Sequence, residues 1–251
     1  MKIQSAGQSP DPSRSLVALG IRILLGITLL FTLPASALAQ VGHPPKSSPF
    51  RDIRKGHTLT VMGGYFKGNG GRFGIGPHGA SVFGARYDIR SSSALLLGIG
   101  VYHGSLERLI VDPFVAVANR VKGPVKQSVT FAEIALQFNL TGGKTWHRLA
   151  PYVATSGGIA FAKSTPTDTS TYNFGKKLYL APAIGFRFFL TDRLHLRAEA
   201  RATFWKLNYP PTFQQAPPAE PTAPPVLAGG STREWVSSRW LQAGLGYSFS
   251  P

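Results

Sequence analysis

The stretch Leu178–Leu190, LYLAPAIGFRFFL, followed after three residues by Leu194–Phe204, LHLRAEARATF, decides the fold class of this chain. In both segments every second residue is apolar or small, and the second segment places histidine, arginine and glutamate between them. A repeat of two residues predicts β-strands with one apolar and one polar face. These segments are longer than the average soluble strand of about 5–6 residues. They suit a strand that crosses a bilayer at a tilt, which needs about 9–11 residues.

The same alternation recurs in six further segments of the chain. They cover residues 59–65, 81–89, 95–101, 132–140, 151–161 and 241–249. Apolar residues facing lipid and polar residues facing inward over about ten positions are typical of transmembrane barrels. We therefore predict an all-β fold: a single closed antiparallel up-and-down transmembrane β-barrel of eight strands, over residues 57–250.

The connections between these segments alternate in length. The long ones are Lys67–Pro77, His103–Gln127, Ser164–Lys176 and Tyr209–Trp235, and the short ones are Arg90–Ser93, Thr141–Arg148 and Asp192–Arg193. Outer-membrane barrels have short periplasmic turns and longer external loops. The pattern favours a barrel over a soluble β-sandwich.

Three features complicate this picture. Pro182 removes a ladder hydrogen bond inside a strand, so we expect a β-bulge there. Residues 111–117 and 121–125 could form an extra hairpin, which would make ten strands. The external loop 209–235 includes seven prolines between Pro210 and Gly230. We expect that tract to be extended and solvated; a partner-binding polyproline stretch is the alternative.

The N-terminus resembles a secretory signal. Basic residues precede the apolar run 23–33, and Ala37-Leu38-Ala39 forms a small-x-small cleavage site. We predict that residues 1–39 are a signal peptide cleaved after Ala39, which sends the chain to the cell outer membrane. An uncleaved anchor is the alternative, but eleven apolar residues fall short of the roughly 20 that span a bilayer. Residues 40–56 are expected to be an irregular lead-in.

Composition narrows the function classes. Hydrophobic residues make up 43% of the 251-residue chain and charged residues 15%, with a formal net charge of +16 and no cysteine. The absence of cysteine excludes disulfides and thiol chemistry. The basic residues are scattered over loop ends of an exported chain, so we expect no nucleic-acid partner.

Several strands share a glycine-spaced pattern, seen in Leu97–Tyr102 (LGIGVY), Ala183–Phe188 (AIGFRF) and Ala243–Phe249 (AGLGYSF). This pattern resembles small outer-membrane barrels of the OmpA/OmpX type. The resemblance implies the barrel fold and recognition of a C-terminal aromatic residue by the barrel assembly machinery. Here Phe249 is followed by Ser250 and Pro251, which departs from the family pattern.

The faces opposite the apolar positions define the barrel interior. They include Gln137, His195, Gln242 and seven charged residues, which we predict form an ion-pair network: Arg86, Asp88, Glu133, Arg187, Arg197, Glu199 and Arg201. An eight-stranded barrel is only wide enough for side chains to fill it. We expect a plugged lumen; a narrow pore or an acid–base site at Glu133 and Glu199 are the alternatives. No residue pattern suggests a cofactor or a metal site.

One pair of residues raises the possibility of an enzyme. His103 and Ser105 resemble the His-x-Ser pair of outer-membrane lipid A deacylases, and both would face lipid. The family's acid lies a hairpin later, whereas the nearby acid here is Glu107, and Leu106 replaces the family's asparagine. We interpret the pair as interfacial residues and the protein as non-enzymatic.

Basic residues gather where strands meet the long loops: Lys67, Arg72, Arg120, Lys122, Lys126, Lys163, Lys176, Lys177, Lys206 and Arg233. Such residues suit lipopolysaccharide phosphates. We expect an aromatic girdle at the same level, made by Tyr65, Tyr102, Trp205, Tyr209, Trp235 and Trp240. The predicted partners are outer-membrane lipid, lipopolysaccharide and the assembly machinery, for a monomer with a structural or surface-interaction role.

Overall fold

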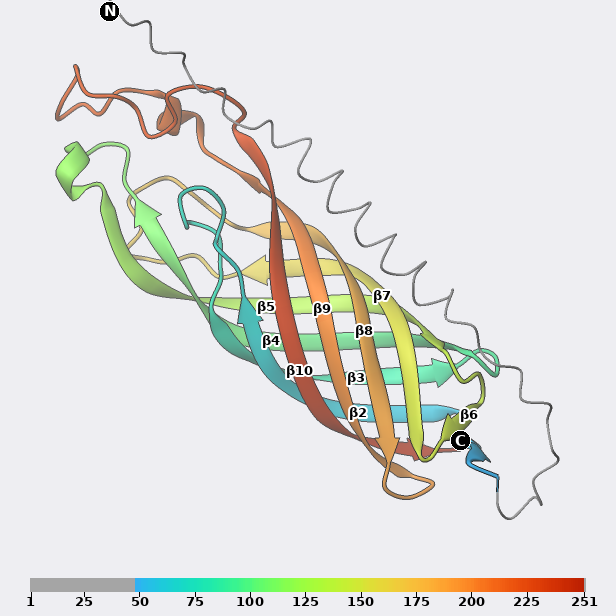
Figure 1. The fold of residues 1–251 in the computed structure, drawn as a ribbon. Helices are drawn as coiled ribbons and strands as arrows, with labels where there is room; N and C mark the ends of the chain where they lie inside the picture. The colour runs from blue at the N-terminus through green and yellow to red at the C-terminus, as the bar shows by residue number, and fades with distance from the viewer. Residues whose placement is uncertain (1–47, 251) are drawn as a thin grey trace, which may run out of the picture. The chain divides into compact units, whose positions relative to one another are not determined.

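A computed structural model describes residues 48–250, so the expected signal peptide over residues 1–39 lies outside the described residues. Within this part, strands of 11 to 19 residues wind around a common axis (Figure 1). They are β2 (His57–Lys67), β3 (Ala80–Arg90), β4 (Leu95–Val111), β5 (Val121–Asn139), β7 (Leu149–Ala162), β8 (Lys176–Phe189), β9 (Leu194–Asn208) and β10 (Arg233–Phe249).

Each long strand pairs antiparallel with the next, and the ring closes where β10 pairs with β2. The closing register runs from Arg239 opposite Lys67 to Phe249 opposite His57. The predicted closed antiparallel barrel of eight strands is therefore confirmed. No helix in residues 48–250 is long and apolar enough to cross a membrane.

Two additional strands lie outside the ring. β1 (Phe50–Asp52) pairs antiparallel with β6 (Lys144–Trp146). The two terminal guanidinium nitrogens of Arg90, Nη1 and Nη2, donate to backbone carbonyls in this region, at Ile53 and Lys55. The expectation of an irregular lead-in over residues 40–56 is therefore wrong for β1, because β6 offers a free strand edge; residues 40–47 lie outside the described part.

The connection expected over residues 103–127 is mostly strand. β4 continues to Val111 and β5 begins at Val121, so only residues 112–120 connect them. The two short segments that could have raised the count to ten are therefore extensions of barrel strands or part of the connection. The register between β4 and β5 shifts between Arg108 and Ile110.

Pro182 causes no bulge. The pairing of β8 with β7 passes through Thr155 opposite Pro182 without a shift. Towards β9, the partners run from Leu180 opposite Phe204 to Ala183 opposite Arg201, which keeps one register while two residues drop out of the pairing. The prediction of a bulge is wrong because the strand tolerates a local gap in its ladder instead of an inserted residue.

The pleat sorts side chains into two environments. Outward residues such as Phe83, Ile134, Leu178, Ile184 and Leu241 are 63–77% exposed. The alternate inward residues are buried, charged towards the short turns and aromatic towards the long loops. The barrel is therefore apolar outside and polar over part of its inside.

The proline-rich connection is packed rather than solvated along its length. Phe213 is fully buried, Leu227 is 5% exposed, and both belong to the cluster that fills the loop end of the barrel. The Leu227 amide donates to the Phe213 carbonyl at 2.7 Å. The expectation of a solvated tract is wrong at these residues, because they supply apolar side chains that the neighbouring loops bury.

Candidate functional site

A chain of ion pairs crosses the barrel interior. On β3, Arg86 Nε donates to Asp88 Oδ1 at 2.7 Å. The other oxygen of Asp88 accepts from Arg197 Nη1 on β9 at 3.0 Å. Arg197 Nη2 then donates to Glu199 Oε2 at 2.8 Å. At most 1% of these side chains is exposed.

The chain continues from β9 to β5. Arg201 contacts Glu199 through Nε at 2.9 Å and Glu133 through Nη1 at 2.8 Å. Each glutamate also accepts a 2.8 Å hydrogen bond from a tyrosine, Glu199 from Tyr152 and Glu133 from Tyr179. Six of the seven predicted network residues thus form one continuous series of salt bridges.

The seventh residue, Arg187, joins the series without a salt bridge of its own among the described residues. Its Nη2 donates to Asn139 Oδ1 at 3.1 Å. Asn139 in turn accepts from Gln137 at 2.8 Å, and Gln137 accepts from Arg197 at 3.0 Å. Sequence reasoning placed Gln137 inside but missed the role of Asn139, although Asn139 shares its inward parity.

This arrangement has a clear chemical consequence. Charges that leave water must be paired and hydrogen-bonded, and a guanidinium fork suits a carboxylate. Glu199 accepts bonds from Arg197, Arg201, Tyr152 and Gln242, and the Gln242 bond is 2.8 Å long. A carboxylate held by two guanidinium groups is poorly suited to exchange protons as a general acid.

Small residues make room for these long side chains. Gly98 lies so close to the network that a Cβ there would meet Asp88 Oδ1 at 2.3 Å. At Gly246 a Cβ would meet His195 Nε2 at 2.3 Å. His195 is fully buried, its ring lies 5.0 Å from that of Phe189, and no group within residues 48–250 forms a hydrogen bond with either ring nitrogen.

An aromatic layer fills the interior on the loop side of the ion pairs. The ring of Phe66 contacts those of Phe131, Trp205 and Trp240, with centroids 5.4–5.8 Å apart. The Arg201 guanidinium lies 4.7 Å from the Trp240 centroid, which joins this layer to the ion pairs.

The expected aromatic girdle is therefore mostly wrong. Tyr102, Trp205, Tyr209 and Trp240 are at most 4% exposed and belong to the interior cluster, whereas Tyr65 and Trp235 are 51% and 65% exposed. The alternation along each strand could have predicted this inward position. Tyr102, Trp205 and Trp240 have the same parity as the inward polar residues of β4, β9 and β10.

Above the aromatic layer, the long loops bind one another. Arg108 forms a buried salt bridge with Asp168, and the Asp112 carboxylate accepts a 2.5 Å hydrogen bond from Thr169. Burial alone would raise the pKa of Asp168, but hydrogen bonds from Ser170 and Arg108 outweigh it, so the pKa lies below the ordinary 3.8.

The proline-rich connection takes part in these contacts. Arg120 donates to the Pro224 carbonyl at 3.2 Å, and the Val117 amide donates to Glu220 at the same distance. Near the other end of the connection, Arg72 donates to the Ser231 carbonyl at 2.8 Å. Arg72 and Arg120, expected to meet lipid phosphates, thus hold loops together.

His103 and Ser105 are exposed on the outward face of β4, as parity predicts. The ring nitrogen Nδ1 of His103 is 2.9 Å from Thr130 Oγ1 on β5. Glu107 follows on the same face of the strand. The hydrogen bond of His103 therefore runs across the strand pair to a threonine and does not join it to Ser105.

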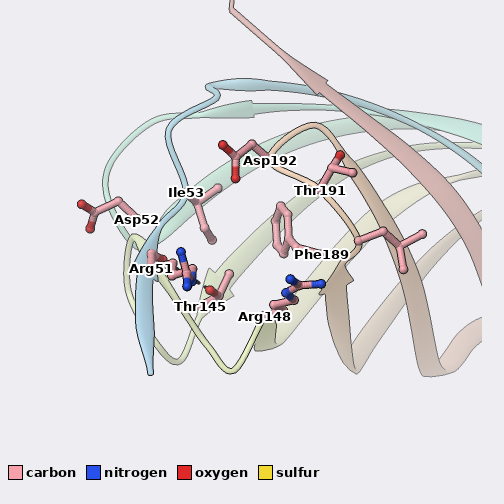
Figure 2. Close-up of a pocket in the computed structure, with 9 residues that line it drawn as sticks. Arg51, Asp52, Ile53, Thr145, Arg148, Phe189, Thr191 and Asp192 are labelled. Carbon is pink, nitrogen blue, oxygen red and sulfur yellow. Dashed lines mark hydrogen bonds between the residues drawn. The ribbon is translucent and has the colours of Figure 1, made fainter. Parts of the chain in front are cut away.

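A small cavity lies at the short-turn end of the barrel. Its volume is about 160 Å3, and its lining includes Arg51, Asp52, Arg148 and Asp192 around the rings and aliphatic groups of Phe189 and Ile53. Figure 2 shows labelled side chains from β1 and the residue after it, from β6 and the turn before β7, and from the end of β8 and the turn after it. Because both charge signs line this cavity, it favours no single class of ligand.

No protein-family model matches the chain, and no curated protein matches it. Among solved structures, the outer membrane protein OprG of Pseudomonas aeruginosa is 14% identical, with a TM-score of 0.44 over 78% of this chain and 98% of that one. Neisserial surface protein A is 11% identical, with a TM-score of 0.46 over 80% and 98% of the two chains. The Yersinia pestis attachment invasion locus protein is 14% identical, with a TM-score of 0.37 over 78% and 99%.

Proposed function

We propose that this chain is a non-enzymatic outer-membrane β-barrel with a closed lumen, whose external loops serve a structural or surface-interaction role. The observation that carries the proposal is the inverted distribution of polarity. Long strands present large apolar side chains outward, while charged residues lie inside. In water such an outer surface would be an extensive exposed apolar patch, which marks a membrane or partner surface.

The closed lumen is supported by two layers that lie one above the other. The ion-pair series spans β3, β5 and β9. The aromatic layer, centred on Phe66, fills the section beyond it. An eight-stranded barrel leaves an interior that side chains can fill, so neither layer needs a further plug.

The remaining parts of the proposal concern export and partners. We propose that residues 1–39 direct secretion and are removed after Ala39, that the assembly machinery inserts the barrel as a monomer, and that its rim contacts lipopolysaccharide. N-terminal sequencing of the protein from isolated outer membranes tests the cleavage site; a start at Gln40 is the expected result.

Two measurements test the barrel and its closure. Membrane fractionation with gel mobility before and after heating should show a heat-modifiable band in the outer-membrane fraction. In planar bilayers we expect no stable conductance from the wild type. A heat-insensitive soluble band would refute the membrane barrel, and stable channels would refute the closed lumen while leaving the barrel intact.

The non-enzymatic assignment has its own test. If His103 and Ser105 formed a hydrolytic pair, Ser105→Ala would change the acylation of lipid A in cells that produce the protein. Because the His103 side chain bonds Thr130 instead, we expect identical lipid A profiles from wild type and variant. A difference between the profiles would overturn the assignment.

A further inference from the structure

Two cations face each other on the outside of the barrel where its ring closes. Lys67, the last residue of β2, lies directly opposite Arg239 of β10. Both side chains are exposed and point to the outer surface. Residues directly opposite on one sheet face have Cβ atoms about 4.5–5.5 Å apart, and like charges placed so are destabilising.

No salt bridge in the described part of the protein offsets this repulsion. None of its salt bridges includes Lys67 or Arg239. The outward positions of β8, β9, β10, β2 and β3 carry no aspartate or glutamate. On the next strand, β4, Glu107 is exposed on the same face and lies directly opposite Lys126. The acid of β10, Glu234, has the inward parity and is bound by Arg72 and Tyr209. Lys67 and Arg239 therefore have no salt-bridge partner among the described residues, and the acid nearest to them on this face, Glu107, already lies opposite Lys126.

The neighbours of the pair locate it at a lipid headgroup level. Two residues towards the short turns, Tyr65 lies opposite Leu241, and these are 51% and 63% exposed. Towards the loops, exposed Trp235 lies opposite Lys206, a third cation on the same face. Tyrosine and tryptophan are enriched at membrane interfaces, and lysine and arginine beside them meet headgroup phosphates.

We infer that Lys67 and Arg239 form a binding site for a phosphate of lipid A, the phosphorylated lipid of the external leaflet. The site rests on the outer-membrane location proposed above. A phosphate monoester group, which is negatively charged, can lie between the two cations and form a charge-assisted contact with each of them, so that the repulsive cross-strand pair is neutralised. Arg239 offers the planar fork that suits phosphate, while Lys67 adds a point charge.

The test measures the affinity of the refolded full barrel for diphosphoryl lipid A in neutral detergent by native mass spectrometry. The site variant is Lys67→Gln with Arg239→Gln. The matched control is Arg54→Gln with Lys144→Gln, which removes two exposed cations from the short-turn end. One juxtamembrane cation near an anionic headgroup corresponds to about a fivefold effect, so the site variant should bind about 30-fold more weakly.

The control variant should lose less than about threefold, because its cations lie at the opposite end of the barrel. Equal losses in the two variants, or none in the site variant, would overturn the site. Inorganic phosphate supplies a second probe: if it competes as well as lipid A at equal concentration, the site takes free anions and not a lipid.

A third variant separates a loss of lipid A binding from a failure to fold. Lys67→Glu places opposite charges across the closing seam, so it should fold at least as well as the wild type while losing lipid A binding. Heat-modifiable mobility and insertion into vesicles are recorded for every variant. A wild type that fails to insert refutes the proposed function and this site with it, whereas inserted barrels with unchanged lipid A affinity refute the site alone.

Discussion

At the scale of single residues, the interior depends on positions without side chains. A Cβ at Gly98 would lie 2.3 Å from Asp88 Oδ1 and 2.9 Å from Arg86 Nε, inside the first salt bridge of the series. Backbone conformation does not require glycine at this position, so the requirement is one of space.

We therefore predict that Gly98→Ala destabilises the barrel by about 1–3 kcal/mol, the usual cost of overpacking a filled interior. Urea unfolding of the detergent-refolded barrel, followed by tryptophan fluorescence, measures the change. Gly157→Ala is the matched control, because its Cβ would meet nothing closer than the Tyr179 carbonyl at 3.9 Å. Equal midpoints for the two variants would contradict the spatial requirement.

Asp168 gives the loop end of the barrel a dependence on pH. Its pKa lies below the ordinary 3.8 because hydrogen bonds from Ser170 and Arg108 outweigh its burial. A carboxyl group with a lowered pKa stabilises the folded loop above its ordinary pKa, and this stability is lost as the pH falls through the lowered value.

Amide exchange of Ser170, whose N–H donates to Asp168 at 2.8 Å, should be slow at neutral pH and accelerate, relative to other loop amides, below 3.8. Asp168→Asn should remove most of this pH dependence. A pH profile that is the same in wild type and variant would assign the effect to another group.

At the scale of elements, the connection 209–232 is anchored by a side chain. Phe213 is fully buried, and its ring lies 6.0 Å from Phe73 and 6.1 Å from Tyr209. A proline-rich tract buries little surface by itself, so these contacts explain why it packs on its neighbours.

We predict that Phe213→Ala loosens this connection, since removing a buried phenylalanine costs about 3–5 kcal/mol. Limited proteolysis should cut within residues 215–230 at least about tenfold faster, while the barrel stays heat-modifiable. The control Gln214→Ala alters an exposed neighbour and should leave the cleavage rate unchanged. Equal rates in both variants would show that the anchor is unnecessary.

At the scale of the whole molecule, the outer surface should respond to charge according to depth. Ile184 lies midway along the apolar face of β8, and Leu178 lies near its loop end; they are 64% and 77% exposed. In a bilayer, arginine costs about 2–4 kcal/mol at the midplane and about 0–1 near the interface.

Unfolding in lipid vesicles should therefore show a larger loss for Ile184→Arg than for Leu178→Arg. In a water-soluble barrel both substitutions fall on exposed surface and would differ little. Similar small losses for the two variants would exclude the membrane-spanning orientation.

Much of this architecture follows from local sequence pattern. The period of two assigned Arg197, Glu199 and Arg201 to the inside and Leu196 and Ile184 to the outside, and the structure agrees. The same parity also predicts that Trp205 and Trp240 point inward, as the structure shows. The expectation of an outer girdle rests only on their position near the loop ends of their strands. Where the local pattern was followed, the prediction was right.

The sequence by itself determined most of the strands and their faces, because side-chain direction along a pleated strand depends only on residue parity. It left the count at eight or ten, and the pairing of β10 with β2 closed the ring at eight. Only the tertiary structure decided that Arg201 bridges Glu133 and Glu199, that Arg187 reaches the network through Asn139, and that Phe213 anchors its loop. Those contacts depend on the register between strands far apart in the chain and on packing between loops, neither of which a local pattern contains.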